Sequence, residues 1–248
     1  MVGSVTLHFH PERGAQGSTV IDRLVVDGCY RSQFETGTSN GGLTAFPGGD
    51  RWRWESRLFD RRYDDAPGAS RPVYGSWNRR GDAHGGSPRF GSAYLRLRED
   101  VVERSTFCFP DSVFEPALFG GPGRLPELCA AADAAGLDAL DDYVEVQVHG
   151  GVSMQRDVEA VVLDPCFRGT PVAAAAQHLP CDVEYHPGYV ARTADLDESF
   201  RTPEAVQLAG ALGVVITPTD VGAAANAGVH DAQVLKHVWH LLARFGRL

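Results

Sequence analysis

Residues 141–151 read DDYVEVQVHGG, a stretch in which polar and apolar side chains alternate without a break. Val144, Val146 and Val148 share one face, and the polar side chains share the other, namely Tyr143, Glu145, Gln147 and His149. A strict period of two predicts an extended strand, and the valines place one side of it in a core. The polar face can line a binding site, or it can be the solvent side of an ordinary antiparallel strand.

The rest of the chain is strand-dominated with scattered helices, which favours an α+β fold. The sequence predicts strands at residues 5–10, 30–35, 92–98, 104–109, 157–163 and 181–186, and helices at residues 18–27, 125–135, 172–178, 203–212 and 231–245. The strand at 157–163 is expected to pair with the alternating strand. Residues 36–88 carry Gly, Pro, Asp or Arg every few positions, which is typical of a long binding loop.

Composition limits the possible classes of protein. The 248 residues suffice for an ample core, and no apolar run is long enough to span a bilayer. The first residues lack the pattern of a secretory signal, so we expect a cytoplasmic protein with no membrane partner. Five cysteines without a CxxC pair argue against a disulfide framework or a thiolate zinc site. The net charge of −9 makes nucleic acid the least expected partner.

A second motif, YRSQFETGTSNGG, occupies residues 30–42. If residues 30–35 form a strand, Arg31, Gln33 and Glu35 share a face, and the strand runs into a Thr/Ser/Asn/Gly loop. An arginine before such a loop is suited to a bidentate grip on a phosphate or pyrophosphate. The alternative is a surface arginine followed by an ordinary polar turn.

Two patterns are compatible with a hydrolase. Residues 37–41 formally match the nucleophile elbow GxSxG, with Ser39 as nucleophile, but Gly and Pro follow where the elbow needs a helix. His8 and His10 would share a face of the first strand and could hold a metal ion together with more distant ligands. Nothing in the spacing selects those further ligands.

Ser105 and Thr106 stand beside Phe107 on an expected strand, where hydroxyls next to an aromatic ring can position a sugar or a flat ring. Three features follow one another in the order that is typical of the ADP-ribosyltransferase superfamily. They are an early arginine (Arg31), a Ser-Thr pair in the middle of the chain (Ser105 and Thr106) and a late glutamate (Glu145) in YVEVQVHGG. The chain resembles the bacterial toxin-like branches of that superfamily over residues 30–163. It is also similar to an uncharacterised bacterial family with no assigned activity.

The resemblance implies split antiparallel sheets around an NAD cleft, in a catalytic domain of residues 1–165, with an α/β extension at 166–248. It implies that Glu145 binds the nicotinamide ribose and stabilises the cation that forms when nicotinamide leaves, with Gln147 beside it. The remaining NAD-binding positions that it implies are Arg31, Gln33, Thr36, Thr38, Ser39, Asn40, Ser105, Thr106, Tyr143 and His10. NAD is then the substrate, and no resident metal is expected.

Two departures from the family pattern leave alternatives open. Branches that modify arginine or asparagine carry Glu or Gln two residues before the catalytic glutamate, and here that residue is Tyr143, so the acceptor is open among protein, small molecule and nucleic acid. Water as acceptor would make the protein an NAD glycohydrolase. Other branches use a strand histidine in place of the leading arginine, a role open to His8 or His10. A non-catalytic nucleotide-binding module is the third possible class.

Overall fold

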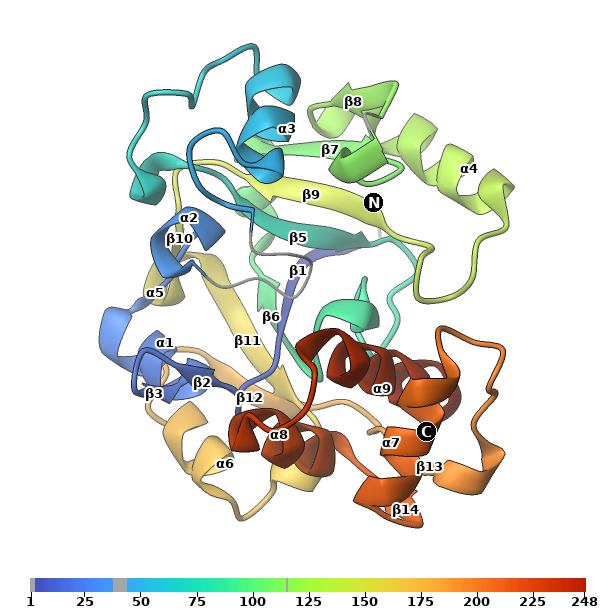
Figure 1. The fold of residues 1–248 in the computed structure, drawn as a ribbon. Helices are drawn as coiled ribbons and strands as arrows, with labels where there is room; N and C mark the ends of the chain where they lie inside the picture. Colours follow the sequence, from blue (N-terminus) through green and yellow to red (C-terminus); the bar gives the residue numbers. More distant parts are fainter. Residues whose placement is uncertain (1–2, 38–43, 115) are drawn as a thin grey trace.

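The computed structural model describes residues 3–37, 44–114 and 116–248. Within these residues eight strands form one mixed sheet (Figure 1), which agrees with the predicted α+β class. The strand order is β12 (Asp182–Tyr185), β11 (Val158–Leu163), β6 (Ala93–Leu97), β1 (Ser4–Phe9), β5 (Val73–Asn78), β9 (Val144–Val148), β7 (Ser105–Phe109) and β8 (Leu118–Gly120). Neighbours are antiparallel except β11 and β12, which are parallel.

The expected separation into two sheets is wrong, because β1 pairs with β5 on one side and with β6 on the other and so joins the two halves. The sheet is strongly twisted instead. In Figure 1, β5, β9 and β7 run at a steep angle to β6 and β11. A right-handed twist accumulates across successive strands, so a sheet of this width can present two differently oriented halves without a break.

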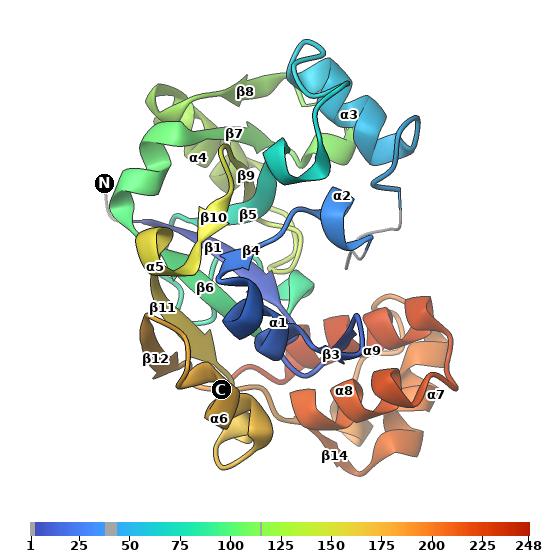
Figure 2. The same cartoon turned by 90° about the vertical axis from the view of Figure 1, so that its left-hand side faces the viewer.

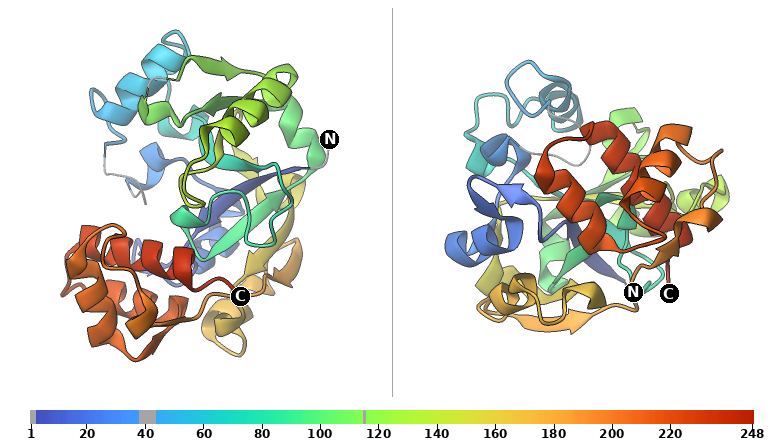
Figure 3. Two further views of the ribbon diagram at one scale, coloured as in Figure 1. Left: turned by 90° about the vertical axis from the view of Figure 1, so that its right-hand side faces the viewer. Right: turned by 60° about the horizontal axis from the view of Figure 1, so that its bottom comes forward.

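Helices surround both halves of the sheet. α3 (Asp50–Leu58) and α4 (Leu125–Ala135) lie near β7 and β9, and α1 (Val20–Asp27) and α6 (Pro171–Ala176) lie near β11 and β12 (Figures 1 and 2). α7 (Pro203–Leu212), α8 (Pro218–Ala227) and α9 (Ala232–Phe245) form a group of their own (Figure 3). The shorter elements are β2 (Gly14–Ala15), β3 (Ser18–Thr19), β4 (Cys29–Tyr30), α2 (Gln33–Thr36), β10 (Val152–Ser153), α5 (Met154–Asp157), β13 (Ala191–Arg192) and β14 (Val215–Ile216).

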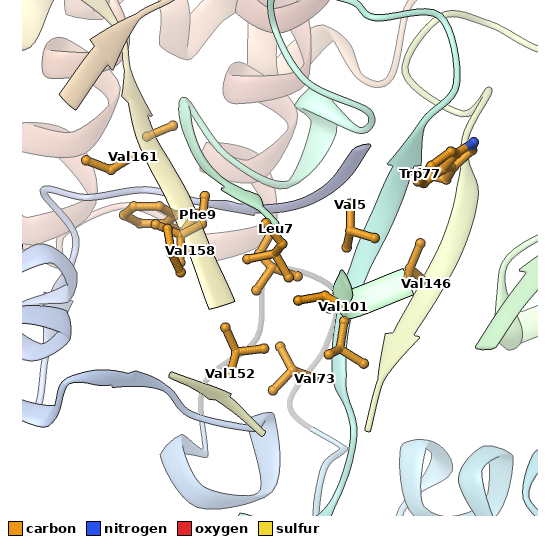
Figure 4. Packing of buried hydrophobic residues seen from close by; sticks show 14 of the residues in the cluster. Val5, Leu7, Phe9, Val73, Trp77, Val101, Val146, Val152, Val158 and Val161 are labelled. Atoms are coloured by element: carbon orange, nitrogen blue, oxygen red, sulfur yellow. The ribbon is translucent and has the colours of Figure 1, made fainter. Parts of the chain in front are cut away.

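The buried side chains form two main clusters. The larger one packs on the sheet and includes Leu7, Val146 and Val158 (Figure 4). The second lies among α7, α8 and α9 and includes Trp239. Phe167 and other side chains from the start of the C-terminal third belong to the sheet cluster. The domain division at residue 165 stays a prediction. None of the described helices is long and apolar enough to cross a membrane.

The helix predicted at residues 18–27 and the predicted alternation at residues 143–149 are confirmed. α1 begins after Thr19, whose hydroxyl accepts from the Asp22 amide in a capping box, and it ends at Gly28 in the left-handed conformation. α4 and α7 occupy the expected residues. In β9 the valine face is buried as predicted, and Glu145 and Gln147 on the opposite face are also buried rather than solvated.

The predicted strand at residues 30–35 is wrong. Strand β4 ends at Tyr30, and a capping box between Ser32 and Glu35 starts helix α2, which ends at left-handed Gly37. Arg31 and Gln33 therefore do not share a strand face. The S-x-x-E spacing that starts this helix is visible in the sequence, but a single turn leaves too short a period to distinguish helix from strand.

The region 36–88, expected to be irregular, contains α3 and the central strand β5. β5 pairs closely with β1 at Gly75, where a Cβ would lie 2.6 Å from the Thr6 carbonyl oxygen. The predicted pairing of 157–163 with the alternating strand is also wrong, since β11 lies between β6 and β12. Helix α8, which starts with a capping box between Thr217 and Asp220, was not predicted.

Candidate functional site

A cleft of about 890 Å³ opens beside the central strands of the sheet. Its wall includes Phe9 from β1, Tyr74 from β5 and Glu145 from β9, and further residues come from α1, α3, α8 and α9. In Figure 2, α3 lies at the top of the molecule and α8 and α9 lie at the bottom. Small-molecule sites have volumes of about 300–1,000 Å³, so this cleft can take a large ligand.

Glu145 is a buried carboxylate in the wall of this cleft. It is 7 % exposed; Ser112 Oγ donates to its Oε2 at 3.2 Å, and Gln147 Nε2 donates to its Oε1 at 2.8 Å. Burial, aided by the nearby charge of Asp111, raises the pKa of Glu145 from 4.5 to about 7, and Arg51 opposes this rise. Near neutral pH this carboxyl group therefore exists in both protonation states.

A chain of hydrogen bonds on the polar faces of β7 and β9 leads to Glu145. Thr106 donates to Gln147 Oε1 at 2.8 Å, and His149 Nε2 lies 2.9 Å from the Thr106 hydroxyl. Tyr63 lies 2.7 Å from His149 Nδ1. Burial lowers the pKa of His149 to about 4, so its ring is neutral and carries one N–H proton. Because the Thr106 hydroxyl uses its own proton to donate to Gln147, it accepts from His149, and the imidazole proton is therefore assigned to Nε2. All donors then point toward Glu145, and the chain fixes the orientation of its carboxylate.

Arg51 also lines the cleft, near enough to Glu145 for its positive charge to lower the pKa of that carboxyl group. Its guanidinium lies 4.5 Å from the ring centre of Tyr74 and 5.4 Å from that of Trp54. Its Nε and Nη1 are buried and have no hydrogen-bond acceptor in the described part of the chain. Stacking on the two rings holds the planar fork in place and leaves its N–H groups available for an anionic group.

A buried ion pair fixes α3, and with it Arg51, against β5. Glu55 is fully buried and receives a 2.7 Å hydrogen bond from Arg71 Nη1 and a 3.0 Å hydrogen bond from the Tyr74 hydroxyl. Arg51 precedes Glu55 by one helical turn, so both side chains lie on the same face of α3. Arg51, which belongs to the region 36–88 that was expected to be an irregular loop, is thereby held in the wall of the cleft.

Five of the NAD-binding positions predicted from the sequence line the cleft: Arg31, Gln33, Thr36, Tyr143 and His10. Ser105, Thr106 and Gln147 do not line it. The Ser105 hydroxyl donates to the Val101 carbonyl, and Thr106 acts on the site only through Gln147. Thr38, Ser39 and Asn40 lie outside the described residues.

Arg31 differs from its predicted role in one respect. Its Nε is 2.8 Å from Asp27 Oδ2, and the side chain is 36 % exposed. A carboxylate of the protein thus already lies within ion-pair distance of Arg31, whereas Arg51 forms no such ion pair within the described residues. Tyr143 lies two positions before Glu145, and its hydroxyl group donates a hydrogen bond to Asp111.

The histidines of the first strand do not form a metal centre. His8 Nδ1 lies 3.3 Å from the Gly91 carbonyl oxygen, and its Nε2 accepts from the Ser87 amide, so both ring nitrogens are engaged. His10 follows β1 and packs edge-to-face on Trp239. Among residues 3–37, 44–114 and 116–248 no three His, Cys, Asp or Glu side chains are grouped to hold a metal ion.

The site residues predicted from the sequence do not include Arg51, Asp111, Ser112 or Lys236, all of which line the cleft or contact Glu145. The motif RWRWE at residues 51–55 contained a usable signal, because Arg51 and Trp54 are spaced three apart as neighbours on a helix face. No local signal brings Ser112 to Glu145, since that contact depends on the pairing of β7 with β9.

These features define an α+β protein with one large, mainly antiparallel sheet and a ligand-sized cleft that contains a buried glutamate. The chain belongs to the family of proteins of unknown function DUF3626, whose family model matches residues 4–134 and 124–245. None of the curated proteins matches the chain. The functional proposal therefore rests on the chemistry of the cleft.

Proposed function

We propose that the protein is an NAD-consuming ADP-ribosyltransferase in which Glu145 promotes the loss of nicotinamide. The observation that carries the proposal is the position of Glu145, buried in the wall of a cleft of about 890 Å³. Its hydrogen bonds hold the carboxylate in one orientation. A carboxylate fixed in a largely dry site can stabilise a developing cation without reorganising during the reaction.

The proposed reaction requires a negative charge at one point. The bond between ribose C1′ and the nicotinamide nitrogen breaks, and the electron pair leaves with nicotinamide. C1′ then carries positive charge as in glycoside cleavage, and the ionised Glu145 stabilises it. The acceptor supplies an electron pair to C1′ and releases its proton. Because the pKa of Glu145 is about 7, we expect the rate to rise with pH until Glu145 is fully ionised.

The surroundings of Glu145 suit the two parts of such a substrate. The rings of Tyr74, Tyr143 and Trp54 line the cleft and can contact a flat nicotinamide ring. Arg51, whose Nε and Nη1 have no acceptor within the described ranges, can donate to a phosphate group. We therefore assign to Arg51 the anion contact that the sequence resemblance gave to Arg31.

Cationic side chains outnumber carboxylates in the wall of the cleft, whereas carboxylates are in excess in the protein as a whole. Its cationic side chains are Arg13, Arg23, Arg31, Arg51, Arg89 and Lys236, and its carboxylates are Asp27, Asp50, Asp111 and Glu145. A local excess of positive charge in a chain of net charge −9 favours a ligand with several negative charges. The acceptor stays open, and water in that role would give an NAD glycohydrolase.

A non-catalytic nucleotide-binding module is the second candidate, and the hydrogen bonding of Glu145 favours it. Oε1 accepts from Gln147 and from the Cys108 thiol, and Oε2 accepts from Ser112, so protein donors already reach both oxygens. A carboxylate with such partners can serve to hold β7, β9 and the turn after β7 together. In this case replacing Glu145 would change stability and leave ligand binding intact.

Release of nicotinamide from NAD by the purified protein tests the proposal. The variant Glu145→Gln keeps the shape of the side chain and removes its charge, and Glu127→Gln is the matched control, because the Glu127 side chain on α4 is exposed. We expect the wild type and Glu127→Gln to release nicotinamide, and Glu145→Gln to lose at least about a hundredfold in rate, as for a fixed electrostatic group. NAD binding without release in the wild type would favour the binding module. Absence of both binding and release would overturn the proposal.

A further inference from the structure

The end of the cleft opposite Arg51 is built by three segments that are distant in the sequence. Arg13 directly precedes the hairpin formed by β2 and β3, Arg89 lies in the 3₁₀ turn Pro88–Phe90, and Lys236 lies on α9. All three side chains line the cleft. Lys236 is the single lysine of the chain, which otherwise carries its positive charges on arginine.

Hydrogen bonds lock the hairpin to the C-terminal helices. The Gly14 amide donates to Asn226 Oδ1 at 2.9 Å, and Asn226 Nδ2 donates to the Glu12 carbonyl at 2.8 Å. Contact with α8 is close, since a Cβ on Gly222 would lie 2.3 Å from Glu12 Cγ. Because these contacts are made by Glu12 and Gly14, the two chain neighbours of Arg13, they fix the backbone of Arg13.

A tryptophan locks α9 to the 3₁₀ turn in the same way. Trp239 Nε1 lies 3.1 Å from the carbonyl oxygens of Pro88 and Arg89. Lys236 precedes Trp239 by three positions, so both lie on one side of α9. The tryptophan therefore sets the position of Lys236 relative to Arg89, and the C-terminal third contributes one wall of the cleft.

The cations at this end are incompletely compensated. Lys236 has no ion-pair partner in the described ranges, and the Nε atoms of Arg13 and Arg89 are buried without an acceptor there. Arg89 pairs through Nη1 with Asp141, which also pairs with Arg201.

The remaining acid near Arg13 is Glu12. It lies 4.0 Å from the Arg13 Nε, and burial raises its pKa to about 7, so its negative charge is incomplete at neutral pH. Burial, together with Arg89 and Arg201, lowers the pKa of Lys236. Burial is the main cause of both shifts, and at Lys236 the neighbouring cations Arg89 and Arg201 add to it.

We infer that Arg13, Arg89 and Lys236 form a binding site for a phosphate or diphosphate group of a small molecule. The guanidinium groups of Arg13 and Arg89, whose Nε atoms have no acceptor among the described residues, and the Lys236 ammonium group can together donate to the several acceptor oxygens of such a group. The site does not include Glu145, so it stands or falls independently of NAD cleavage. If NAD is the substrate, this site adds an anion contact at the opposite end of the cleft from Arg51.

The single lysine makes the site directly observable. Reductive methylation with ¹³C-formaldehyde labels Lys236 and the N-terminal amine, and the spectrum of Lys236→Arg identifies the lysine signal. We expect the labelled Lys236 to titrate below the ordinary lysine pKa of 10.5, and inorganic pyrophosphate to shift its resonance saturably and to raise its pKa. A resonance that does not respond to pyrophosphate would overturn the inference.

Calorimetric titration of the unlabelled protein with pyrophosphate gives the second measurement. We expect Lys236→Gln to weaken binding at least about tenfold, as for loss of a charged hydrogen bond, and Lys236→Arg to retain most of the affinity. The control Arg192→Gln removes an exposed charge that does not line the cleft and should bind as the wild type does. Equal affinity of Lys236→Gln and the wild type would refute the site.

Two further titrations separate this inference from the proposed function and identify the ligand. Glu145→Gln should bind pyrophosphate as the wild type does, even where it fails to release nicotinamide. ADP in place of pyrophosphate shows whether a nucleoside adds affinity: tighter binding of ADP assigns the group to a nucleotide, and equal binding assigns it to a phosphate ligand without a nucleoside. Pyrophosphate affinity lost in Glu145→Gln and kept in Lys236→Gln would overturn the assignment of residues.

Discussion

Gln147 donates a hydrogen bond of 2.8 Å from Nε2 to Oε1 of Glu145, two positions earlier on the same strand. Residues two apart on a strand share a face, and here their contact takes place in a fully buried environment. The amide also accepts from Thr106, so it transmits the orientation of the neighbouring strand to the carboxylate. Gln147 is thus a positioning residue for Glu145, without lining the cleft itself.

Replacing Gln147 should raise the pKa of Glu145 further. The variant Gln147→Leu removes an N–H donor that favours the ionised carboxylate, and it leaves Thr106 without its acceptor. We expect a loss of about 1–3 kcal/mol in the free energy of unfolding. Carboxyl ¹³C titration by NMR measures the pKa. Thr106→Val keeps the bond between Gln147 and Glu145 and should shift the pKa less; equal shifts in both variants would contradict this role.

The buried carboxyl of Glu145 should also make stability depend on pH. Its pKa is about 7 in the folded protein against an ordinary value of 4.5, so the folded state holds the proton more tightly. Its contribution to the free energy of unfolding is complete below pH 4.5 and falls as pH rises through 7. A rise from 4.5 to about 7 corresponds to about 3 kcal/mol.

Denaturant unfolding of the wild type and Glu145→Gln between pH 4 and pH 8 tests this dependence. The variant should gain stability relative to the wild type as pH rises, by about 3 kcal/mol over the whole range. Glu127→Gln, whose carboxylate is exposed on α4, should follow the wild type at every pH. A difference between Glu145→Gln and the wild type that does not change with pH would show that Glu145 titrates normally.

Removing Arg51 should affect Glu145 and ligand binding together. The variant Arg51→Gln deletes a positive charge that favours the ionised form of Glu145, so the pKa of Glu145 should rise. The affinity for NAD should fall about tenfold or more if the free N–H groups of Arg51 contact a phosphate. Arg53→Gln is the matched control, because Arg53 lies on the same helix with its side chain 61 % exposed. An effect of the same size in both variants would contradict a specific role for Arg51.

The local elements of this fold are largely predictable from sequence, whereas the walls of the cleft are not. The alternation of Val144, Val146 and Val148 predicts β9, and Thr19 with Gly28 predicts the ends of α1, because these signals lie within a few residues. The strand predicted at residues 30–35 fails where two short-range signals compete. In the region 36–88, the sequence shows the frequent Gly, Pro, Asp and Arg residues. It does not show that β5 forms there by pairing with β1 and β9.

The α+β class, the alternating strand with its polar face, and the choice of Glu145 as a candidate site residue could all be predicted from the sequence. Three features of the cleft could not: the proximity of Arg51 to Glu145, the ion pair between Arg31 and Asp27, and the position of Lys236 in the same cleft. The physical reason is that periodicity and capping arise from neighbours along the chain. Cleft walls arise from strand pairing and helix docking between distant segments, whose free energies depend on the burial achieved by the whole fold.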